Sequence, residues 1–570
     1  MTNQKTEDSR QRTEILLQLC RVLEIPYRAA EHDVLSSVMH LVTDSRAIQR
    51  GDTFVAYPGE KSDGRNFIAQ AIERGANAVI WDSHQFTWND AWQIPNLAVT
   101  DLRHQAGWLA DAVYGNPSEK MWVVGITGTN GKTSTSHWIA GAMNNAGKKC
   151  ALIGTLGNGF PSEDITNDLA GVVCQPSQMA SSSIRGQKTG AMNNPGQGTG
   201  STDLSPQSSV LCLQPTLNTT PDAIRLHGLL ADYLALGAQN VAMEVSSHAL
   251  AQGRVNGVRF NVALLTNLSR DHLDYHGDMQ SYAASKRKLF EWKQLKYAVL
   301  NLDDAFGVEL AESLQEAEVE VIGYGMSNAA LQLAERLGLR MVYGNLVQMT
   351  GQGLQLEVHS SWGAAQIDSE LVGRFNAANL LGVLAVLLVS EISLSDAVLS
   401  LSKAQPVAGR MQRVSSGQQP TVIVDFAHSP DALEKVLLAL REVRATAGSK
   451  LICVFGCGGD RDRGKRAMMG KVVEEFSDWC VVTSDNPRSE DPQQIIAEIV
   501  AGMRSDNHEI IVERAAAIQH AISRAQKTDT VLIAGKGHED YQEICGVKYP
   551  FNDVLVAKQA LEVSHAEVLA

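Results

Sequence analysis

The stretch GITGTNGKTS at residues 125–134 predicts a phosphate-binding loop. The apolar run 121–124 before it predicts a buried strand, and the stretch of about 133–146 after it predicts a helix. Glycines let the backbone turn so that successive N–H groups face a phosphate, and the helix adds the positive end of its dipole. Lys132 can reach the β- and γ-phosphates, and Thr133 can offer its hydroxyl to Mg2+. The loop therefore predicts nucleotide chemistry.

The glycine spacing departs from the common pattern G-x-x-x-x-G-K-[ST], because Ile126 stands where that pattern has its first glycine. A glycine-rich turn between a strand and a helix is the alternative interpretation of such a pattern. The run Gly131-Lys132-Thr133 between strand and helix favours nucleotide binding.

Length and composition describe an ordinary soluble globular protein. With 570 residues, 44% apolar and 20% charged, the chain is expected to form about three or four domains. The net charge of −14 argues against a nucleic-acid partner, because phosphate backbones would be repelled. It leaves room for anionic small substrates, which need only a local basic pocket.

The sequence predicts a cytoplasmic protein with reduced cysteines. The polar start MTNQKTEDSR lacks the apolar core of a signal peptide. The most apolar stretch, 377–389, is shorter than the ~20 residues of a membrane span, so we expect a buried helix there. The eight cysteines are scattered, with Cys453 and Cys457 the closest pair, and they form neither a zinc pattern nor a disulfide framework.

Short apolar runs alternate with helical stretches, which predicts an α/β fold with parallel sheets covered by helices. We expect an N-terminal domain over 1–118, a central ATP-binding domain over 119–405 and a C-terminal domain over 406–570. In the last domain each strand ends in Gly, Asp, His or Arg, and ligands of open α/β sheets bind at those carboxyl ends. The segment 161–215 is rich in Ser, Gly, Gln and Asn, and it predicts a disordered insertion within the central domain rather than a linker between domains.

Further motifs follow the phosphate loop in a specific order. They are Asn218-Thr-Thr, Glu244-Val-Ser-Ser-His, Asn267-Leu-Ser-Arg-Asp-His, Gly373-Arg-Phe-Asn, Asp425-Phe-Ala-His-Ser-Pro-Asp and Asp485-Asn-Pro-Arg. In this order they closely resemble the Mur ligases, the ATP-dependent amide-forming enzymes of bacterial cell-wall synthesis. The resemblance covers nearly the whole chain apart from 161–215. The departures are Phe426 for the usual Tyr, Ser429 for Thr and Gln412 for Glu.

The resemblance implies a three-domain architecture with a central P-loop ATPase domain and a C-terminal Rossmann-like domain. It implies ATP-dependent addition of meso-2,6-diaminopimelate to UDP-N-acetylmuramoyl-L-alanyl-D-glutamate through an acyl phosphate, giving the UDP-muramoyl-tripeptide, ADP and phosphate. Mg2+ is the implied metal and ATP the co-substrate. We expect a monomer in the cytoplasm, without a nucleic-acid partner and without membrane insertion.

The family motifs also imply site residues. Those implied for catalysis are Lys132, Glu244, His272 and Lys286, and those for Mg2+ are Thr133, Glu244, His272 and carbamylated Lys286. Those implied for ATP are Gly128, Thr129, Asn130, Gly131, Lys132, Thr133, Ser134, Asn376 and Arg410, with His428 and Asp431 near the nucleotide and the domain junction. Those implied for the UDP-muramoyl dipeptide are Thr43, Ser45, Glu60, Lys61, Ser62, Asn218, Thr219, Thr220, Ser246, Gln252 and Arg254. Those implied for diaminopimelate are Arg461, Asp485, Asn486, Pro487, Arg488, Gly535 and Glu539.

Two of these residues have informative alternatives. An ammonium has no lone pair for a metal, whereas a carbamate on Lys286 would be an anionic oxygen ligand of the kind that Mg2+ prefers. The alternative is an exposed helix lysine. Arg488 can bind the second carboxylate of diaminopimelate as a fork, and it would repel the ammonium of L-lysine. The alternative is a surface turn.

Three rival functions remain. The nearest is the same ligation with L-lysine. A folylpolyglutamate synthetase-like ligase shares the Gly-Thr-Asn-Gly-Lys core, but Thr43-Asp-Ser-Arg46 and the Asp485–Arg488 motif argue against it. A nucleotide-binding regulator without catalysis is disfavoured, because Lys132, Glu244, His272 and Lys286 are all present.

Overall fold

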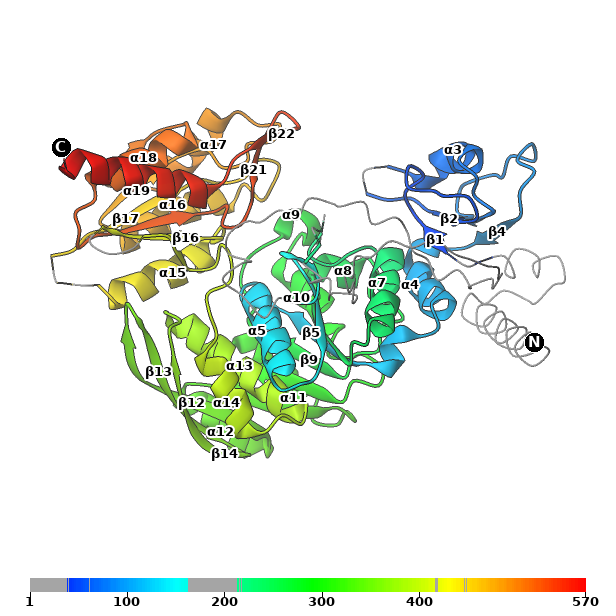
Figure 1. Cartoon of the computed structure of the whole chain (residues 1–570), viewed down its shortest axis with the longest axis horizontal. Coiled ribbons are helices and arrows are strands. Elements are labelled where there is room, and N and C mark those ends of the chain that lie inside the picture. Colours follow the sequence, from blue (N-terminus) through cyan, green and yellow to red (C-terminus); the bar gives the residue numbers. More distant parts are fainter. Residues whose placement is uncertain are drawn as a thin grey trace, which may run out of the picture.

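The computed structural model describes residues 38, 40–60, 62–161, 213, 214, 216, 218–415, 419–444, 446 and 448–569, and the side chains of 564–569 are not described. Lys61 and nearly all of the insertion expected over 161–215 lie outside these residues. In the described part, the strands of the chain form one sheet near the N-terminus, one in the middle and one near the C-terminus, plus a separate hairpin. Figure 1 shows the first sheet and the C-terminal unit on either side of the central unit.

The N-terminal sheet is parallel, in the order β1 (Leu41–Val42), β2 (Thr53–Ala56), β3 (Ala78–Asp82) and β4 (Asn96–Val99). The short helix η1 (Gly64–Phe67) and α3 (Ile68–Glu73) follow β2, and α4 (Leu102–Val113) follows β4. Leu102, Leu109 and Ala110 of α4 are buried with Val55 of β2 and Ile224, which lies in the central unit. This shared core joins the N-terminal unit to the central one.

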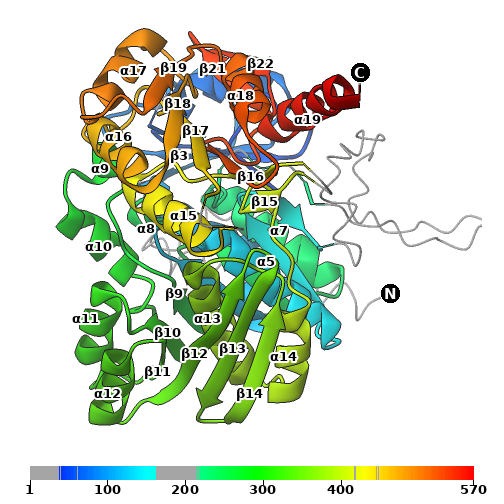
Figure 2. The same ribbon diagram turned by 90° about the vertical axis from the view of Figure 1, so that its left-hand side faces the viewer.

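The central sheet has β5 (Trp122–Thr127) deep in its interior, and its strand order is β14-β13-β12-β11-β10-β9-β5-β8-β6-β7. Its other strands are β6 (Cys150–Gly154), β7 (Gly157–Gly159), β8 (Asn240–Glu244), β9 (Val262–Leu265), β10 (Tyr297–Asn301), β11 (Glu320–Gly325), β12 (Arg340–Thr350), β13 (Gly353–Ser360) and β14 (Gly363–Ser369). Strands β5, β6, β8, β9, β10, β11 and β12 pair in parallel, whereas β7, β13 and β14 add antiparallel pairs. Figure 2 shows β12, β13 and β14 side by side at one edge.

Helices cover both faces of the central sheet. The core on one face contains residues of α5 (Lys132–Asn145), α13 (Arg374–Val389) and α14 (Leu394–Ser402). The other core contains residues of α7 (Ala223–Ala235), α8 (Ser247–Ala251), α11 (Ala305–Ser313) and α12 (Asn328–Leu337). The remaining elements are η2 (Pro117–Lys120), α9 (Leu273–His276) and α10 (Met279–Arg287). The apolar stretch 377–389 lies within α13 and is buried except for the half-buried Ala378, as its composition predicted.

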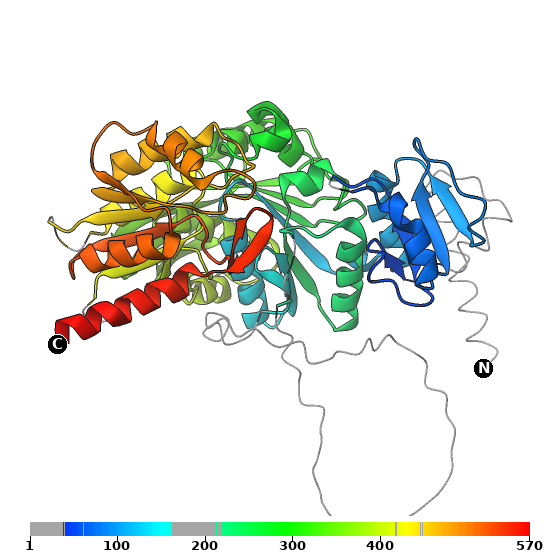
Figure 3. The same ribbon diagram turned by 90° about the horizontal axis from the view of Figure 1, so that it is seen from above.

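The C-terminal sheet has the order β15-β16-β20-β17-β18-β19. Its strands are β15 (Gln412–Arg413), β16 (Thr421–Asp425), β17 (Leu451–Phe455), β18 (Trp479–Val482), β19 (His508–Ile510) and β20 (Thr530–Ala534), and only the β15–β16 pair is antiparallel. Residues of α15 (Pro430–Glu442), α16 (Lys465–Phe476) and α17 (Pro492–Val500) are buried on one face, and those of α18 (Arg514–Arg524) and α19 (Asp553–Leu569) on the other. The hairpin of β21 (Tyr541–Ile544) and β22 (Val547–Pro550) is drawn in red in Figure 3.

None of the helices in the described ranges combines the length and the apolar character that crossing a membrane requires.

Candidate active site between the central and C-terminal units

The phosphate loop lies between β5 and α5, where the sequence predicted it. Gly128 and Gly131 have φ values of +146° and +86°, which side-chain-bearing residues rarely adopt. A Cβ on Gly128 would also lie 1.9 Å from Thr266 Oγ1. Two main-chain groups of the loop are fixed by Asn267, because Thr129 N donates to its carbonyl at 2.8 Å and Asn130 N to its Oδ1 at 3.1 Å. The loop conformation thus depends on a segment far along the chain.

Lys132 folds back over the loop it follows. Its Nζ donates to Gly128 O and to Thr129 O, both at 2.8 Å. Burial lowers the pKa of Lys132, although Glu244 attracts the charge. These two carbonyl contacts can be exchanged for phosphate oxygens, and the lysine then serves as the mobile point charge of the loop.

Oxygen atoms suited to Mg2+ lie beside Lys132. Thr133 Oγ1 donates to Glu244 Oε2 at 3.0 Å, and the same carboxylate accepts from Thr155 N at 2.8 Å through Oε1. Glu244 lies fully buried at the end of β8 rather than at a solvated strand end. No cluster of three or more His, Cys, Asp or Glu side chains that could hold a metal occurs in the described ranges. A hydroxyl and one carboxylate nevertheless fit Mg2+, which commonly takes its other oxygens from phosphates and water.

Lys286 lies against the same loop. Its Nζ donates to Gly128 O at 2.8 Å and stands 4.6 Å from the ring centre of Tyr282. The side chain is 1% exposed, so the alternative of an exposed helix lysine is wrong. Burial lowers the pKa of Lys286 well below its usual range, and nearby Lys132 acts in the same direction. Within the described residues no carboxylate lies within ion-pair distance of Lys286.

His272 lies among aromatic rings beside this lysine. Its ring centre is 4.9 Å from that of His248 and 6.1 Å from that of Tyr282. Desolvation lowers the pKa of His272 to about 3 against the attraction of Asp271, and Lys132 and Lys286 add to the shift. A neutral imidazole is the form that can coordinate a metal.

The C-terminal unit reaches the phosphate loop through charged and polar groups. Asp431 Oδ2 accepts from Asn130 Nδ2 and from Ser269 Oγ, both at 2.9 Å. Arg410 Nη2 donates to Thr133 Oγ1 at 3.4 Å, and its guanidinium lies 4.4 Å from the ring centre of Phe426. The predicted positions of Arg410 and Asp431 at the nucleotide site therefore have direct geometric support.

Asn376 has a different environment. Its Nδ2 donates to Val372 O at 2.8 Å, at the start of α13. The asparagine that contacts the loop is Asn379, because a Cβ on Gly131 would lie 2.7 Å from Asn379 Oδ1. Asn379 is three residues further along the same helix, and this spacing places it on the same face as Asn376. That spacing is the sequence signal that could have identified Asn379. Thr155, Asn267 and Tyr282 were missed as well, because they belong to no phosphate-loop pattern.

The residues predicted for the dipeptide form a network at the junction with the N-terminal unit. Gln252 Nε2 donates to Glu60 Oε1, and Arg254 Nε donates to Gln252 Oε1 at 2.6 Å. Arg254 Nη1 also donates to Thr220 O at 3.0 Å, and Thr220 Oγ1 donates to Glu244 O at 2.8 Å. Ser246 caps α8 with its hydroxyl. The network ends at the main-chain carbonyl of Glu244, whose carboxylate lies beside Thr133.

Other residues of that set are placed less directly. Thr219 Oγ1 accepts from Thr155 Oγ1 at 3.1 Å, whereas Asn218 is exposed with its main-chain N–H on Thr216. Ser45 Oγ donates to Gln70 Oε1 at 2.6 Å within the N-terminal unit. Thr43 follows β1, and Ser62 lies in the turn after β2.

The residues predicted for the amino acid converge at the carboxyl ends of β17, β18 and β20. Asn486 Nδ2 donates to Glu539 Oε2 at 2.8 Å, and Lys536 Nζ donates to the same oxygen at 2.9 Å. A Cβ on Gly535 would lie 2.5 Å from Asp485 Oδ2, so only glycine fits there. Arg514 and Lys536 hold the pKa of Asp485 below its usual value although burial acts against them. Sequence reasoning missed Lys536, which is fully buried between Asn486 and Glu539.

The side chains of Arg461 and Arg488 both approach Gly458 in this site. A Cβ on Gly458 would lie 2.9 Å from Arg488 Nη1 and 3.9 Å from Arg461 Cγ. Arg488 is only 20% exposed in its side chain and donates through Nη1 to Gly459 O at 2.7 Å, so the alternative of a surface turn is wrong. Pro487 O lies 2.0 Å from where a Cβ on Gly459 would be, which brings the loop against the 458–461 segment.

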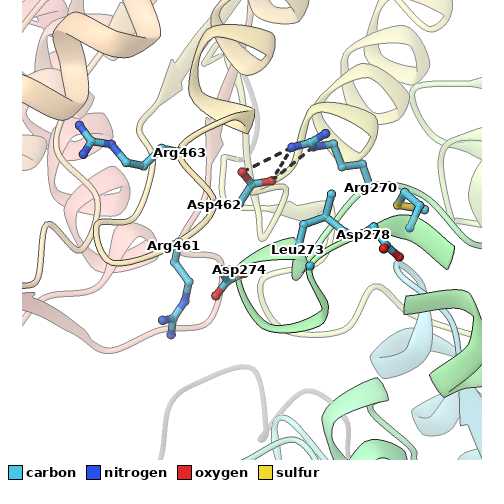
Figure 4. Close-up of a pocket in the computed structure, with 9 residues that line it drawn as sticks. Arg270, Leu273, Asp274, Asp278, Arg461, Asp462 and Arg463 are labelled. Carbon is cyan, nitrogen blue, oxygen red and sulfur yellow. Dashed lines mark hydrogen bonds and ion pairs between the residues drawn. The ribbon is translucent and has the colours of Figure 1, made fainter. Parts of the chain in front are cut away.

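An open cleft of about 600 Å³ lies beside Arg461, between the central and C-terminal units. Figure 4 shows its charged lining, with Arg270 directed toward Asp462. The ion pair between these two is 3.1 Å and joins the units across the cleft. Asp271, the next residue, is 3.6 Å from His428 Nε2 and 3.9 Å from Lys465 Nζ. The phosphate loop and the amino-acid site therefore belong to units that meet at one polar interface.

Three family models match this chain. Residues 37–114 match the Mur ligase family, catalytic domain; residues 126–387 match the Mur ligase middle domain; and residues 409–537 match the Mur ligase, glutamate ligase domain. A protein of Nitrosomonas europaea named UDP-N-acetylmuramoyl-L-alanyl-D-glutamate--2,6-diaminopimelate ligase is 46% identical over 534 residues, covering 92% of this chain and 93% of the relative.

A protein of Chromobacterium violaceum with the same name is 47% identical over 528 residues, covering 92% of this chain and 94% of the relative. A solved structure of a ligase with that name has a TM-score of 0.59 and 32% identity, covering 93% of this chain and 95% of the other. By identity and coverage, the chain belongs to the Mur ligase family.

Proposed function

We propose that this chain uses ATP to join meso-2,6-diaminopimelate to UDP-N-acetylmuramoyl-L-alanyl-D-glutamate, releasing ADP and phosphate. The observation that carries the proposal is the pairing of two sites across one interface. The phosphate loop carries Lys132, and the facing unit carries Arg461, Arg488 and Glu539. The names of the relatives from Nitrosomonas europaea and Chromobacterium violaceum support the same substrates.

In the first step, a carboxylate oxygen of the D-glutamyl residue attacks the γ-phosphorus, an O–P bond forms, and ADP leaves. Such a transfer depends mainly on positioning and on neutralising charge at the phosphoryl group. Lys132 releases its two carbonyl contacts and follows the γ-phosphate, while Arg410, 3.4 Å from Thr133 Oγ1, adds a second positive charge. The product is an acyl phosphate.

We assign Mg2+ to the oxygen atoms of Thr133 and Glu244, together with His272 and a carbamate on Lys286. When bound, Mg2+ neutralises charge on the transferring phosphoryl group. Carbamylation would join the nitrogen of the neutral Lys286 amine to the carbon of CO2 with loss of one proton, and it would place an anion where the lysine lies. The burial of Lys286 without a carboxylate partner supports this assignment.

The dipeptide is assigned to the network of Thr220, Gln252 and Arg254, which leads directly to Glu244. Arg254 supplies a fork for a carboxylate once its contact with Gln252 opens. This placement brings the D-glutamyl carboxylate to the phosphate loop. The uridine nucleotide is assigned to the N-terminal unit around Thr43, Ser45 and the loop 60–62.

In the second step, the amine of the incoming amino acid attacks the acyl carbon, a C–N bond forms, and phosphate leaves with the C–O bond broken. Glu539 and Asp485 are suited to hold an ammonium group, and Arg488 is suited to hold the far carboxylate. L-lysine lacks that carboxylate, so Arg488 favours diaminopimelate. We place the reaction in the cytoplasm, carried out by a monomer.

The test is an assay with ATP, Mg2+ and UDP-muramoyl-dipeptide in which either meso-diaminopimelate or L-lysine is added. We expect ADP release and a tripeptide product by mass spectrometry with diaminopimelate, and little product with lysine. Equal use of L-lysine would overturn the assignment of the amino acid. A chain that binds ATP and forms no product with either amino acid would overturn the proposed ligation.

A further inference from the structure

The β21–β22 hairpin contacts the amino-acid-binding loop at successive residues. Gln542 Nε2 donates to Asp485 O at 2.6 Å, and Glu543 N donates to Asn486 Oδ1 at 2.9 Å. The hairpin is not part of the C-terminal sheet, because its two strands pair only with each other among the described strands. Its contacts therefore bear on this loop rather than on the sheet.

Arg488 has the main-chain geometry that most needs such support. Its φ of +53° lies in the left-handed region, which is strained for a non-glycine residue. Arg488 N donates to Glu543 O at 3.0 Å, and Cys545 N donates to Arg488 O at 2.7 Å. Both main-chain groups of Arg488 are thus fixed by the hairpin.

The side chain of Arg488 is oriented from the same strand. Glu543 Oε2 lies 3.5 Å from Arg488 Nε, and Gly459 O accepts from Nη1 at 2.7 Å. Within the described residues, no hydrogen bond involves Nη2 of Arg488. With Nε and one hydrogen of Nη1 held by protein groups, Nη2 and the second hydrogen of Nη1 remain for a ligand carboxylate.

We propose that Glu543 is a positioning residue that, through Arg488, sets the preference for an amino acid with a second carboxylate. The inference rests on the proposed function. Glu543 holds the guanidinium plane from the Nε side and Gly459 from the Nη1 side, so that the arginine meets the far carboxylate in one orientation. Pre-organisation of this kind lowers the ordering cost of binding and leaves the phosphoryl step untouched.

The experiment compares Glu543→Ala, Glu543→Gln and Glu543→Asp in the full-length chain with wild type. Initial rates are measured while meso-diaminopimelate or L-lysine is varied at saturating ATP and UDP-muramoyl-dipeptide. Glu543→Ala should raise KM for diaminopimelate about fivefold, as expected for a partly exposed ion pair, with kcat and KM for ATP unchanged. Glu543→Asp should recover part of the loss, and Glu543→Gln should lie between Ala and wild type.

Glu509→Ala is the matched control, because Glu509 lies in the same unit and forms an ion pair of 2.6 Å with Arg524. This ion pair lies away from the amino-acid site. The Glu509→Ala variant should leave every KM unchanged. Arg488→Ala supplies the second test, since a residue that acts through Arg488 loses its effect when the arginine is absent. The double variant Glu543→Ala/Arg488→Ala should therefore have the diaminopimelate-to-lysine preference of Arg488→Ala alone.

An unchanged or lowered KM for diaminopimelate in Glu543→Ala would overturn the inference, because Glu543 would then be inert or would compete with the substrate. Equal effects on diaminopimelate and lysine would also overturn it, as would additive effects in the double variant. A wild-type chain that prefers L-lysine would refute the proposed substrate instead, so the two failures are distinguishable.

Discussion

Replacing Lys286 by methionine separates catalysis from folding. The substitution keeps the length of the side chain and removes an amine that is 1% exposed and 2.8 Å from Gly128 O. If Lys286 is carbamylated, the change deletes an anionic ligand beside the phosphoryl group. We therefore expect activity to fall at least about a thousandfold, or roughly 4 kcal/mol in transition-state stabilisation.

The expected change in folding stability is much smaller. The hydrogen bond to Gly128 O and the contact with the Tyr282 ring, 4.6 Å away, each contribute about 1 kcal/mol. Removing the buried amine near Lys132 should stabilise the fold by a similar amount, because replacing a buried ion with a hydrophobic side chain often leaves stability unchanged or raises it. The free energy of unfolding should stay within about 2 kcal/mol of wild type.

The assay measures ADP release and tripeptide formation together with the Tm of each variant. Lys288→Met is the control, because Lys288 is exposed two residues along the same segment, and it should retain full activity. Lys286→Arg should also be inactive, since a guanidinium cannot form the carbamate. Short carboxylic acids should partly restore Lys286→Ala, because its shortened side chain leaves room for the missing oxygen ligand. A fully active Lys286→Arg variant would refute the reasoning.

Three further outcomes are expected. Arg488→Ala should weaken use of diaminopimelate by about 2–4 kcal/mol in kcat/KM while KM for ATP stays constant, and a raised KM for ATP alone would contradict the assignment. Glu244→Gln should raise the Mg2+ concentration needed for half-maximal rate at least about tenfold, whereas the exposed Glu357→Gln on β13 should leave the Mg2+ titration unchanged. Replacing residues 165–210 by a short Gly-Ser linker should keep kcat within about threefold, and a hundredfold loss would show that the segment contributes to the site.

Much of the fold could be predicted because its signals are local. The stretches 240–248, 421–428, 451–460 and 530–539 each begin with an apolar run, and these runs form the strands β8, β16, β17 and β20. The buried helix over 377–389 follows from the same rule, because an unbroken apolar stretch must find an apolar environment. The antiparallel extension β13–β14 had no comparable motif, and its position in the sheet comes from pairing with β12.

The candidate site also has a part that local sequence signals predict and a part that they do not. Phosphate-loop residues are adjacent in sequence, so the spacing of Gly131, Lys132 and Thr133 was sufficient to predict their place between β5 and α5. Lys536, Asn379 and Glu543 escaped prediction because each acts through a partner that only folding brings near. Asn379 illustrates this well, since the motif drew attention to Asn376 one helical turn earlier.

The phosphate loop, the alternation of apolar runs with helical stretches, and the family follow from the sequence alone, because they depend on residues that are neighbours or occur in a fixed order. The folded structure was needed to show that Lys286, 158 residues from Gly128, lies buried against the loop, and that Asp431 reaches Asn130 across 301 residues. The burial of Lys286 and the contact between Asp431 and Asn130 arise when remote parts of the chain pack together. No local pattern encodes them, because the same residues on an exposed helix or turn would read identically in the sequence.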